Sequence, residues 1–303
     1  MIHFYYGAND FAIRRQISSL TAQFAKKYGV ENVVRLESSQ ADADKLLSEI
    51  VNIGLFSPNR LIIIDDVFGN KDLVSKLADG LSRVPDETNL VLVSAKPDKR
   101  TKLYKELVKI TKPREFAQLK PFEIDKFVVE EAAAQHVETK PDGIKELVVY
   151  TGGDMWRIAS EIAKFQALGK VVTAARVREL VEPDLSASAF NLLDDLLNGR
   201  RDQALRELAK LRRTEDANKF LGLLSSQVFA LTAAVNAGEK PSGAVAGEMG
   251  VHPFVMSKMF DVARKMSPRD VARIAQIVAE TDAKTKSTGA DSWILIELVI
   301  NKV

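Results

Sequence analysis

Residues 2–14 read IHFYYGANDFAIR, and the fold of the N-terminal part follows from them. The apolar and aromatic run Ile2–Tyr6 predicts a strand, and the pattern from Asp10 onward predicts a helix, so a strand enters a helix through a turn at Gly7. Nucleotide-hydrolysing α/β proteins carry G-x-x-x-x-G-K-[ST] at such a turn, because bare amides and a lysine hold the phosphates. This turn lacks the second glycine, the lysine and the hydroxyl ligand for magnesium. Asp10 is expected to cap the helix, and its charge would repel a phosphate. The layout is that of a nucleotide-binding domain without its chemistry.

Strand and helix patterns alternate over the first 118 residues. The predicted strands are 2–6, 32–36, 60–65, 89–94 and a weaker 114–117, and the predicted helices are 10–28, 42–51, 71–83 and 101–109. Such alternation is typical of a mostly parallel sheet covered by helices on both faces. The fold class predicted for this part is therefore α/β.

Only helical patterns follow Lys120, and the predicted fold of the remainder is all-α. Predicted helices at 121–134, 141–151, 154–168 and 173–180 form a small bundle. Pro183 then breaks the chain, and further helices are predicted at 187–198, 202–212, 217–237, 253–264, 268–284 and 291–301. The sequence thus predicts three domains: an α/β domain at 1–118, a small helical domain at 119–182 and a larger helical domain at 183–303.

The composition excludes several classes of site. The 303 residues are 46% apolar and 28% charged with a net charge of +2, as in ordinary globular proteins. Cysteine is absent, which excludes disulfides, thiolate zinc sites and cysteine nucleophiles. The three histidines, His3, His136 and His252, are too far apart to predict a metal site. The longest lipid-compatible stretch, Phe220–Val235, contains polar residues and is shorter than the ~20 residues of a spanning helix. We expect a cytoplasmic protein without metal or cofactor.

Two segments near the third predicted strand carry candidate chemistry. Arg60–Asp66 resembles a Walker B segment, but without a phosphate loop we expect no catalysis there. Leu55 and Phe56 lie between Gly54 and Pro58. This pair either plugs the helix–sheet interface or projects outward, where burying each side chain in a partner would contribute about 1.5–3 kcal/mol.

A basic cluster follows the fourth predicted strand. It consists of Lys96, Lys99, Arg100, Lys102 and Lys105. Ligands approach open α/β sheets at the carboxyl ends of the strands, so the cluster is a candidate contact for DNA phosphates or an acidic partner. The alternative is a solvated helix face. Aromatic stacking partners are sparse, which argues against sequence-specific binding of single strands.

Residues 242–266 have the spacing of a DNA-reading helix-turn-helix, with a loose turn at Ala246-Gly247-x-x-Gly250. Its second helix is mostly apolar, with Phe254, Met256 and Met259 among its members. Packing is the favoured interpretation.

Several segments together resemble the delta subunit of the bacterial DNA polymerase III clamp loader, in the family's order and over almost the whole chain. They are Tyr6-Gly7-x-Asn9-Asp10, Leu55-Phe56-Ser57, Leu92-Val93-Ser94-x-Lys96-x-Asp98-Lys99-Arg100, Leu119-Lys120-Pro121, Gly152-Gly153-Asp154-Met155-Trp156-Arg157 leading to Glu161 and Lys164, and Val251-His252-Pro253-Phe254-Val255.

The resemblance implies a fold related to AAA+ ATPases, with a sheet domain that has lost nucleotide binding, a helical lid at 119–182 and a collar domain at 183–303. It implies a subunit that opens the ring-shaped sliding clamp (beta subunit) by inserting a leucine–phenylalanine pair, Leu55 and Phe56 here, into a hydrophobic pocket. The implied partners are the gamma/tau ATPase subunits and the delta-prime subunit in a hetero-oligomeric ring, and primed DNA through the complex, with no membrane contact. Arg157 takes the place of the lid arginine that senses nucleotide in active relatives, and without nucleotide we expect it to be structural.

The resemblance implies no catalytic activity for this chain. Polymerase (nucleotidyltransferase) activity would belong to the holoenzyme, because no residue pattern here supports nucleotidyl transfer. Two alternatives remain: an active AAA+ ATPase with a divergent phosphate loop, and a helix-turn-helix DNA-binding regulator.

Overall fold

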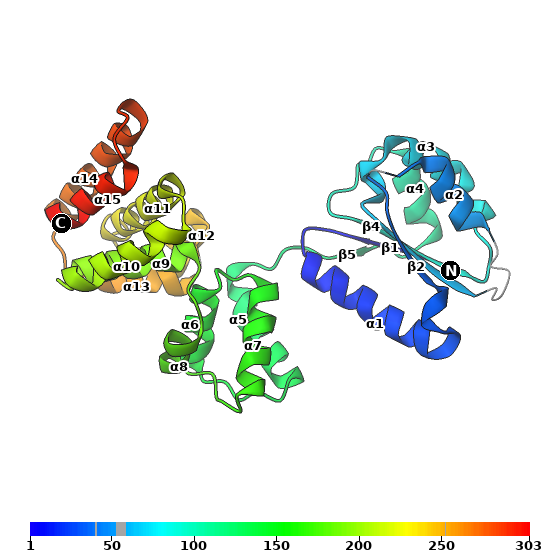
Figure 1. The fold of residues 1–303 in the computed structure, drawn as a ribbon, viewed down its shortest axis with the longest axis horizontal. Coiled ribbons are helices and arrows are strands. Elements are labelled where there is room, and N and C mark those ends of the chain that lie inside the picture. Colours follow the sequence, from blue (N-terminus) through cyan, green and yellow to red (C-terminus); the bar gives the residue numbers. More distant parts are fainter. Residues whose placement is uncertain (40, 53–58, 252) are drawn as a thin grey trace. The chain divides into compact units, whose positions relative to one another are not determined.

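The computed structural model describes residues 1–39, 41–52, 59–251 and 253–303 (Figure 1). Two compact units, Met1–Leu119 and Lys120–Val303, make up the chain, and each has its own hydrophobic core. No helix in the described ranges is both long and apolar enough to cross a membrane.

The first unit is a five-stranded parallel sheet in the order β2-β3-β4-β1-β5, with helices on both faces (Figure 1). The strands are β1 (Ile2–Tyr6), β2 (Val33–Glu37), β3 (Arg60–Asp65), β4 (Thr88–Ser94) and β5 (Arg114–Glu115). The helices are α1 (Asp10–Tyr28), α2 (Ala43–Val51), α3 (Lys71–Gly80) and α4 (Lys102–Ile110), with short 3₁₀ turns at Val30–Asn32, Val67–Gly69 and Leu81–Arg83. The α/β prediction for this part is confirmed.

Successive residues of each strand point to opposite faces of the sheet, and each face packs against different helices. Tyr5, Leu61 and Ile63 pack in the cluster that contains the buried side chains of α1. Their neighbours in the strands, including Phe4 and Ile62, pack in the cluster that contains α2, α3 and α4. Because successive side chains of a strand point to opposite faces, one sheet supports both layers.

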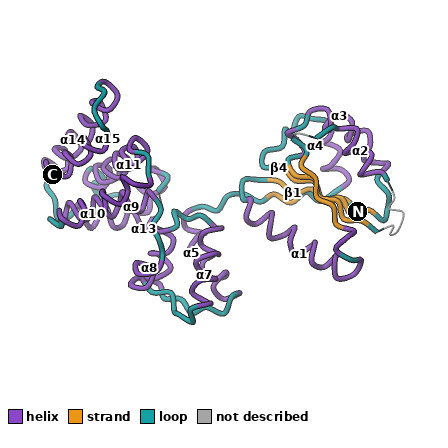
Figure 2. The backbone as a smooth tube through the Cα atoms, in the orientation of Figure 1, coloured by secondary structure: helices purple, strands orange, loops and turns teal. Residues whose placement is uncertain are grey.

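The second unit is helical throughout, apart from one isolated bridge between Thr139 and Val172 in the described residues (Figure 2). Its helices are α5 (Pro121–Ala134), α6 (Pro141–Tyr150), α7 (Met155–Ala167), α8 (Ala174–Leu180), α9 (Leu185–Leu197), α10 (Arg201–Thr214), α11 (Ala217–Val235), α12 (Ser242–Met249), α13 (Pro253–Ala263), α14 (Pro268–Ser287) and α15 (Ser292–Lys302). The all-α prediction is confirmed. The regions predicted as lid and collar both lie in this unit, so their division into two domains stays a prediction.

Helix α12 is not among the separately predicted helices. Gly243 and Gly247 weaken its helical pattern, since glycine costs about 1 kcal/mol relative to alanine inside a helix. Ala246 and Gly247, expected in a turn, lie within α12. The turn is at Gly250, whose φ of 67° gives the left-handed conformation common at helix ends.

Candidate functional site

The turn between β1 and α1 is closed by the backbone of Phe116, the residue after β5. The Phe116 N–H donates to the carbonyl of Tyr6 at 2.7 Å, and the Phe116 carbonyl accepts from the N–H of Asn9 at 3.0 Å. Gly7 has a φ of 129°, and a Cβ built on it would lie 2.2 Å from the Phe116 carbonyl oxygen. The amide at the start of the helix and the space beside the glycine are therefore both taken up by backbone.

Asn9 caps α1, and the prediction that Asp10 does so was wrong by one residue. The Asn9 side-chain oxygen accepts from the N–H of Ala12 at 3.0 Å. Asp10 is the first helical residue and forms an exposed ion pair with Arg14 at 3.2 Å. Asparagine and aspartate are equally good caps, so composition alone does not decide between neighbours. The negative charge still lies in the first turn.

The acidic end of β3 is engaged by arginines. Asp65 accepts from Nη1 of Arg14 and from Nε of Arg35, both at 2.7 Å, and its side chain is only 9% exposed. These contacts tie α1 and β2 to the end of β3. The next residue, Asp66, has a left-handed φ of 50°. Burial, with the charges of Glu37 and Asp65 nearby, raises the pKa of Asp66 above its usual range. Asp65 thus sits in a structural ion-pair network, whereas Asp66 lies beside the like charges of Glu37 and Asp65.

Leu55 and Phe56 lie outside the described residues, so their predicted outward position stays untested. The ends of their segment are described and are held together by Arg60. Its Nη1 donates to the carbonyls of Glu49 and Asn52, each at 3.1 Å, and its Nη2 forms an ion pair with the Glu49 carboxylate. A guanidinium that bonds the last carbonyls of a helix caps that end, and here it also joins α2 to the first residue of β3.

The basic cluster lies where predicted, after β4 and along α4. Some of its side chains pair with carboxylates of the same chain and others do not. Arg100 makes two 2.9 Å contacts with Asp98, and Lys102 pairs with Asp79. The Lys99 ammonium lies over the Tyr6 ring, 5.7 Å from its centroid. Lys96 and Lys105 are exposed, and neither forms an ion pair within the described residues. Lys96, Lys99 and Lys105 are therefore the charges least committed to carboxylates within the protein.

Arg157 contacts the chain segment that follows α8. Its guanidinium donates to the carbonyl of Glu182 at 2.8 Å, while its backbone N–H is capped by Asp154. The side chain therefore ties the start of α7 to the link before α9.

The helix-turn-helix-like segment packs inward, as the sequence favours. In α13, Met256 and Met259 are fully buried, and Val245 and Ala246 of α12 are buried with them in the same core. The side chain of Phe254 lies outside the described part. A helix whose apolar residues are used in its own core has few groups left to read base edges.

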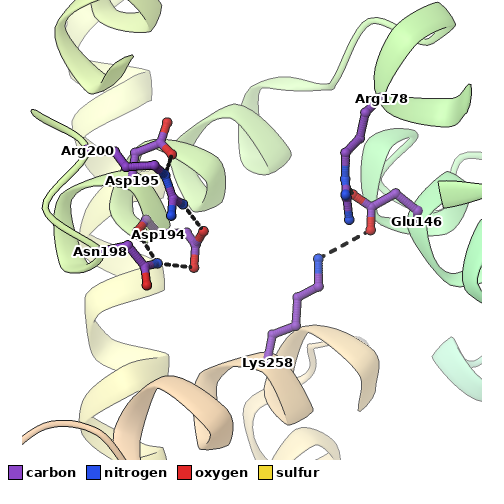
Figure 3. Close-up of polar contacts among 7 residues, drawn as sticks. All are labelled: Glu146, Arg178, Asp194, Asp195, Asn198, Arg200 and Lys258. Atoms are coloured by element: carbon purple, nitrogen blue, oxygen red, sulfur yellow. Dashed lines mark hydrogen bonds and ion pairs between the residues drawn. The ribbon is translucent and has the colours of Figure 1, made fainter. Parts of the chain in front are cut away.

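A polar cluster in the second unit was not predicted (Figure 3). The buried carboxylate of Glu146 accepts from Nε of Arg178 at 2.8 Å and from Nζ of Lys258 at 3.3 Å. These partners are 32 and 112 residues away in sequence, and charge spacing along one chain gives no signal over such separations. Within the described ranges, no group of three or more histidine, cysteine or acidic side chains is arranged to hold a metal ion.

Comparison with known proteins identifies the family. Residues 3–115 match the family model described as DNA polymerase III, delta subunit, and residues 186–303 match that of the DNA polymerase III delta subunit, C-terminal domain. DNA polymerase III subunit delta of Bacillus subtilis (strain 168) is 23% identical over 313 residues, covering 97% of this chain and 90% of the relative.

A solved structure, the Bacillus subtilis DNA clamp loader delta protein (YqeN), superimposes with a TM-score of 0.59 at 23% identity, covering 99% of this chain and 94% of that chain. This likeness shows a shared fold. The two family matches together span more than half of the chain, and both models describe the same subunit. The chain therefore belongs to the DNA polymerase III delta subunit family.

Proposed function

We propose that this chain binds and opens the ring-shaped sliding clamp for loading onto primed DNA, and that it does so without binding ATP. The observation that carries the ATP part is the closed turn between β1 and α1. There the Asn9 N–H is bonded to the Phe116 carbonyl and Asp65 is engaged by Arg14 and Arg35. A phosphate would have to displace backbone and would meet the charge of Asp10.

Calorimetry with ATP and magnesium tests the ATP part. We expect no saturable heat up to millimolar nucleotide. Saturation at micromolar nucleotide would instead favour an active ATPase with a divergent loop. The transcription-regulator alternative predicts sequence-specific DNA binding, which a gel-shift assay with the full chain would detect and which the buried Met256 and Met259 argue against.

The clamp part rests on Leu55 and Phe56, by their position in the family's motif. A ligand shifts a conformational equilibrium only by its preference for one state, so the pair must bind the open clamp more tightly than the closed ring. Two buried apolar side chains supply roughly 3–6 kcal/mol before the costs of association. Arg60 supports this role, because it joins Glu49 and Asn52, which precede the segment, to the start of β3, which follows it.

A double variant tests the clamp part. Leu55→Ala with Phe56→Ala should fold normally and lose measurable binding to an immobilised clamp. The matched control is Val108→Ala with Ile110→Ala, which likewise truncates two apolar side chains; these belong to α4 and are about half exposed. Unchanged affinity of the first variant, or an equal loss in the control, would reject the assignment.

The remaining partners of the proposal are the gamma/tau ATPase subunits and delta-prime, with which the collar region 183–303 would assemble in a ring. The resetting energy would come from ATP in those neighbours, and nucleotidyl transfer from other holoenzyme subunits. Lys96, Lys99, Arg100 and Lys102 are proposed to meet DNA phosphates or an acidic partner.

Salt dependence tests the DNA contact. Each lost phosphate contact should lower the slope of log affinity against log salt by about 0.9 in the assembled loader. We therefore expect Lys96→Gln with Lys99→Gln to reduce the slope. The control Lys240→Gln, in a residue of the collar region that pairs with Glu248, should leave it unchanged. An unchanged slope in both would assign the cluster to solvent.

A further inference from the structure

The second unit contains two groups of helices with separate cores. The lid helices, α5–α8, pack on one another, and the collar helices, α9–α15, pack on one another. Every member of the large apolar cluster around α9, α11 and α14 lies at or after Leu185. In the described part of the unit, no lid helix shares more than marginal contact with a collar helix. Little apolar burial therefore holds the two groups together.

A cleft of about 820 Å³ lies between the two groups. One wall includes Glu146, Tyr150 and Arg178 from the lid helices, and the other includes Asn191 and Lys258 from the collar helices. Many of the side chains that line the cleft are charged. Water can therefore fill the cleft when it opens without exposing a large apolar surface. Such a gap permits relative movement that a packed apolar interface would resist.

At one end of the cleft, residues 182–184 fasten both groups. The Glu182 carbonyl accepts from Arg157 of α7, and the Asp184 N–H donates to the Tyr150 carbonyl at 2.8 Å. The Asp184 carboxylate accepts from the N–H of Ala187 at 2.6 Å and so caps α9. With Pro183 between them, these residues form a short, doubly anchored pivot.

Across the cleft, the collar residue Lys258 reaches the lid through the carboxylate of Glu146 (Figure 3). The Glu146 side chain is 4% exposed, whereas that of Lys258 is 29% exposed and lies over the ring of Phe190 at 5.2 Å. Arg178 holds Glu146 from within the lid at 2.8 Å. The contact thus joins a buried carboxylate of the lid, which is held by a lid arginine, to a partly solvated ammonium group of the collar.

We propose that Glu146 and Lys258 form a latch that keeps the cleft closed, and that its release lets the lid helices rotate about residues 182–184. Lys258 can leave at modest cost, because it is partly solvated and Glu146 keeps Arg178 as a counter-ion. A closed and an open arrangement that differ in this polar contact form the kind of two-state element that domain rotations use. The latch does not depend on the clamp assignment.

Distance measurement between two spin labels tests the latch, and the cysteine-free chain makes the labelling specific. Ser160→Cys on α7 and Ala279→Cys on α14 provide exposed sites in the two groups. We expect one narrow distance distribution in the otherwise unchanged chain. Lys258→Met, which keeps the stem on Phe190, should lower the ratio of latched to unlatched molecules about tenfold and add a second distance.

Three further variants separate the latch from general damage. Glu146→Gln should add the second distance as well, and Lys258→Arg should restore the narrow distribution. Arg178→Met should leave it narrow, because Lys258 still holds Glu146. Lys240→Met removes a collar ion pair with Glu248 at 2.9 Å that does not cross the cleft, and should change nothing. A narrow distribution in Lys258→Met, or equal broadening in Lys240→Met, would overturn the latch.

Discussion

Arg60→Met should loosen both ends of the segment that carries Leu55 and Phe56 without altering the segment itself. The Arg60 side chain is 12% exposed, and three of its contacts go to the end of α2. Methionine fills a similar volume along the stem but donates no hydrogen bond. The variant therefore removes the contacts that hold the last turn of α2 to β3 and leaves the core side chains unchanged.

The expected loss follows from these contacts. Hydrogen bonds that involve a charged group contribute about 1.5–3 kcal/mol each, but the bond to Asn52 is exposed and the Glu49 side chain is 40% exposed. After discounting both for solvent, we expect the first unit to lose about 2–3 kcal/mol of unfolding free energy. If about 1–2 kcal/mol of this acts on the ordering of the segment ends, clamp affinity falls roughly 5- to 30-fold.

Urea denaturation and binding to an immobilised clamp measure the two effects separately. The control is Arg83→Met, because Arg83 is an exposed arginine of the same unit and does not border the segment. Wild-type clamp affinity in a destabilised Arg60→Met would show that the base of the segment does not position it. Unchanged stability would show that the three contacts contribute nothing measurable, and the reasoning from geometry would then fail at its first step.

Two other substitutions test the sheet domain. Gly7→Ala combines a φ of 129° with a contact of 2.2 Å to the Phe116 carbonyl oxygen, so we expect it to cost more than about 2 kcal/mol in denaturation, whereas Gly243→Ala, with open space around its Cβ, should be neutral or stabilising. The Arg100 side chain and backbone N–H lower the pKa of Asp98 from 3.8 to about 2. Because this pKa is depressed in the folded protein, the stabilising contact is complete above about pH 4 and is lost as the pH falls through about 2. In Arg100→Gln, the pKa of Asp98 should rise toward 3.8, which carboxyl NMR titration measures. A pKa that stays near 2 would contradict the ion pair.

Local patterns in the sequence were enough to predict the elements other than α12, but not the contacts between the elements. Helix α1 was predicted with its observed bounds, because its apolar spacing is regular. The closure of the turn at Gly7 could not be predicted from the sequence, because it depends on the register in which β5 pairs with β1. The arginine contacts of Asp65 and the pairing of Glu146 with Lys258 likewise join residues far apart in sequence. Leu55 and Phe56 were candidates from their place between Gly54 and Pro58, but only the family motif favoured an outward position, because a short apolar pair has no periodicity.

The direction of the strands separates the two surfaces proposed for this domain. All strands are parallel, so the residues that follow β1 and β4 lie at the carboxyl edge of the sheet, where the closed turn and the basic cluster are found. The segment between Asn52 and Arg60 instead precedes β3, and Arg60 pairs with Thr88 at the start of β4, which places the ends of the segment at the opposite, amino edge. The proposed loss of phosphate binding at one edge would therefore leave the connection at the other edge unaffected. For the same reason, the effects of substitutions in the basic cluster and at Arg60 should add without coupling, because they share no partner.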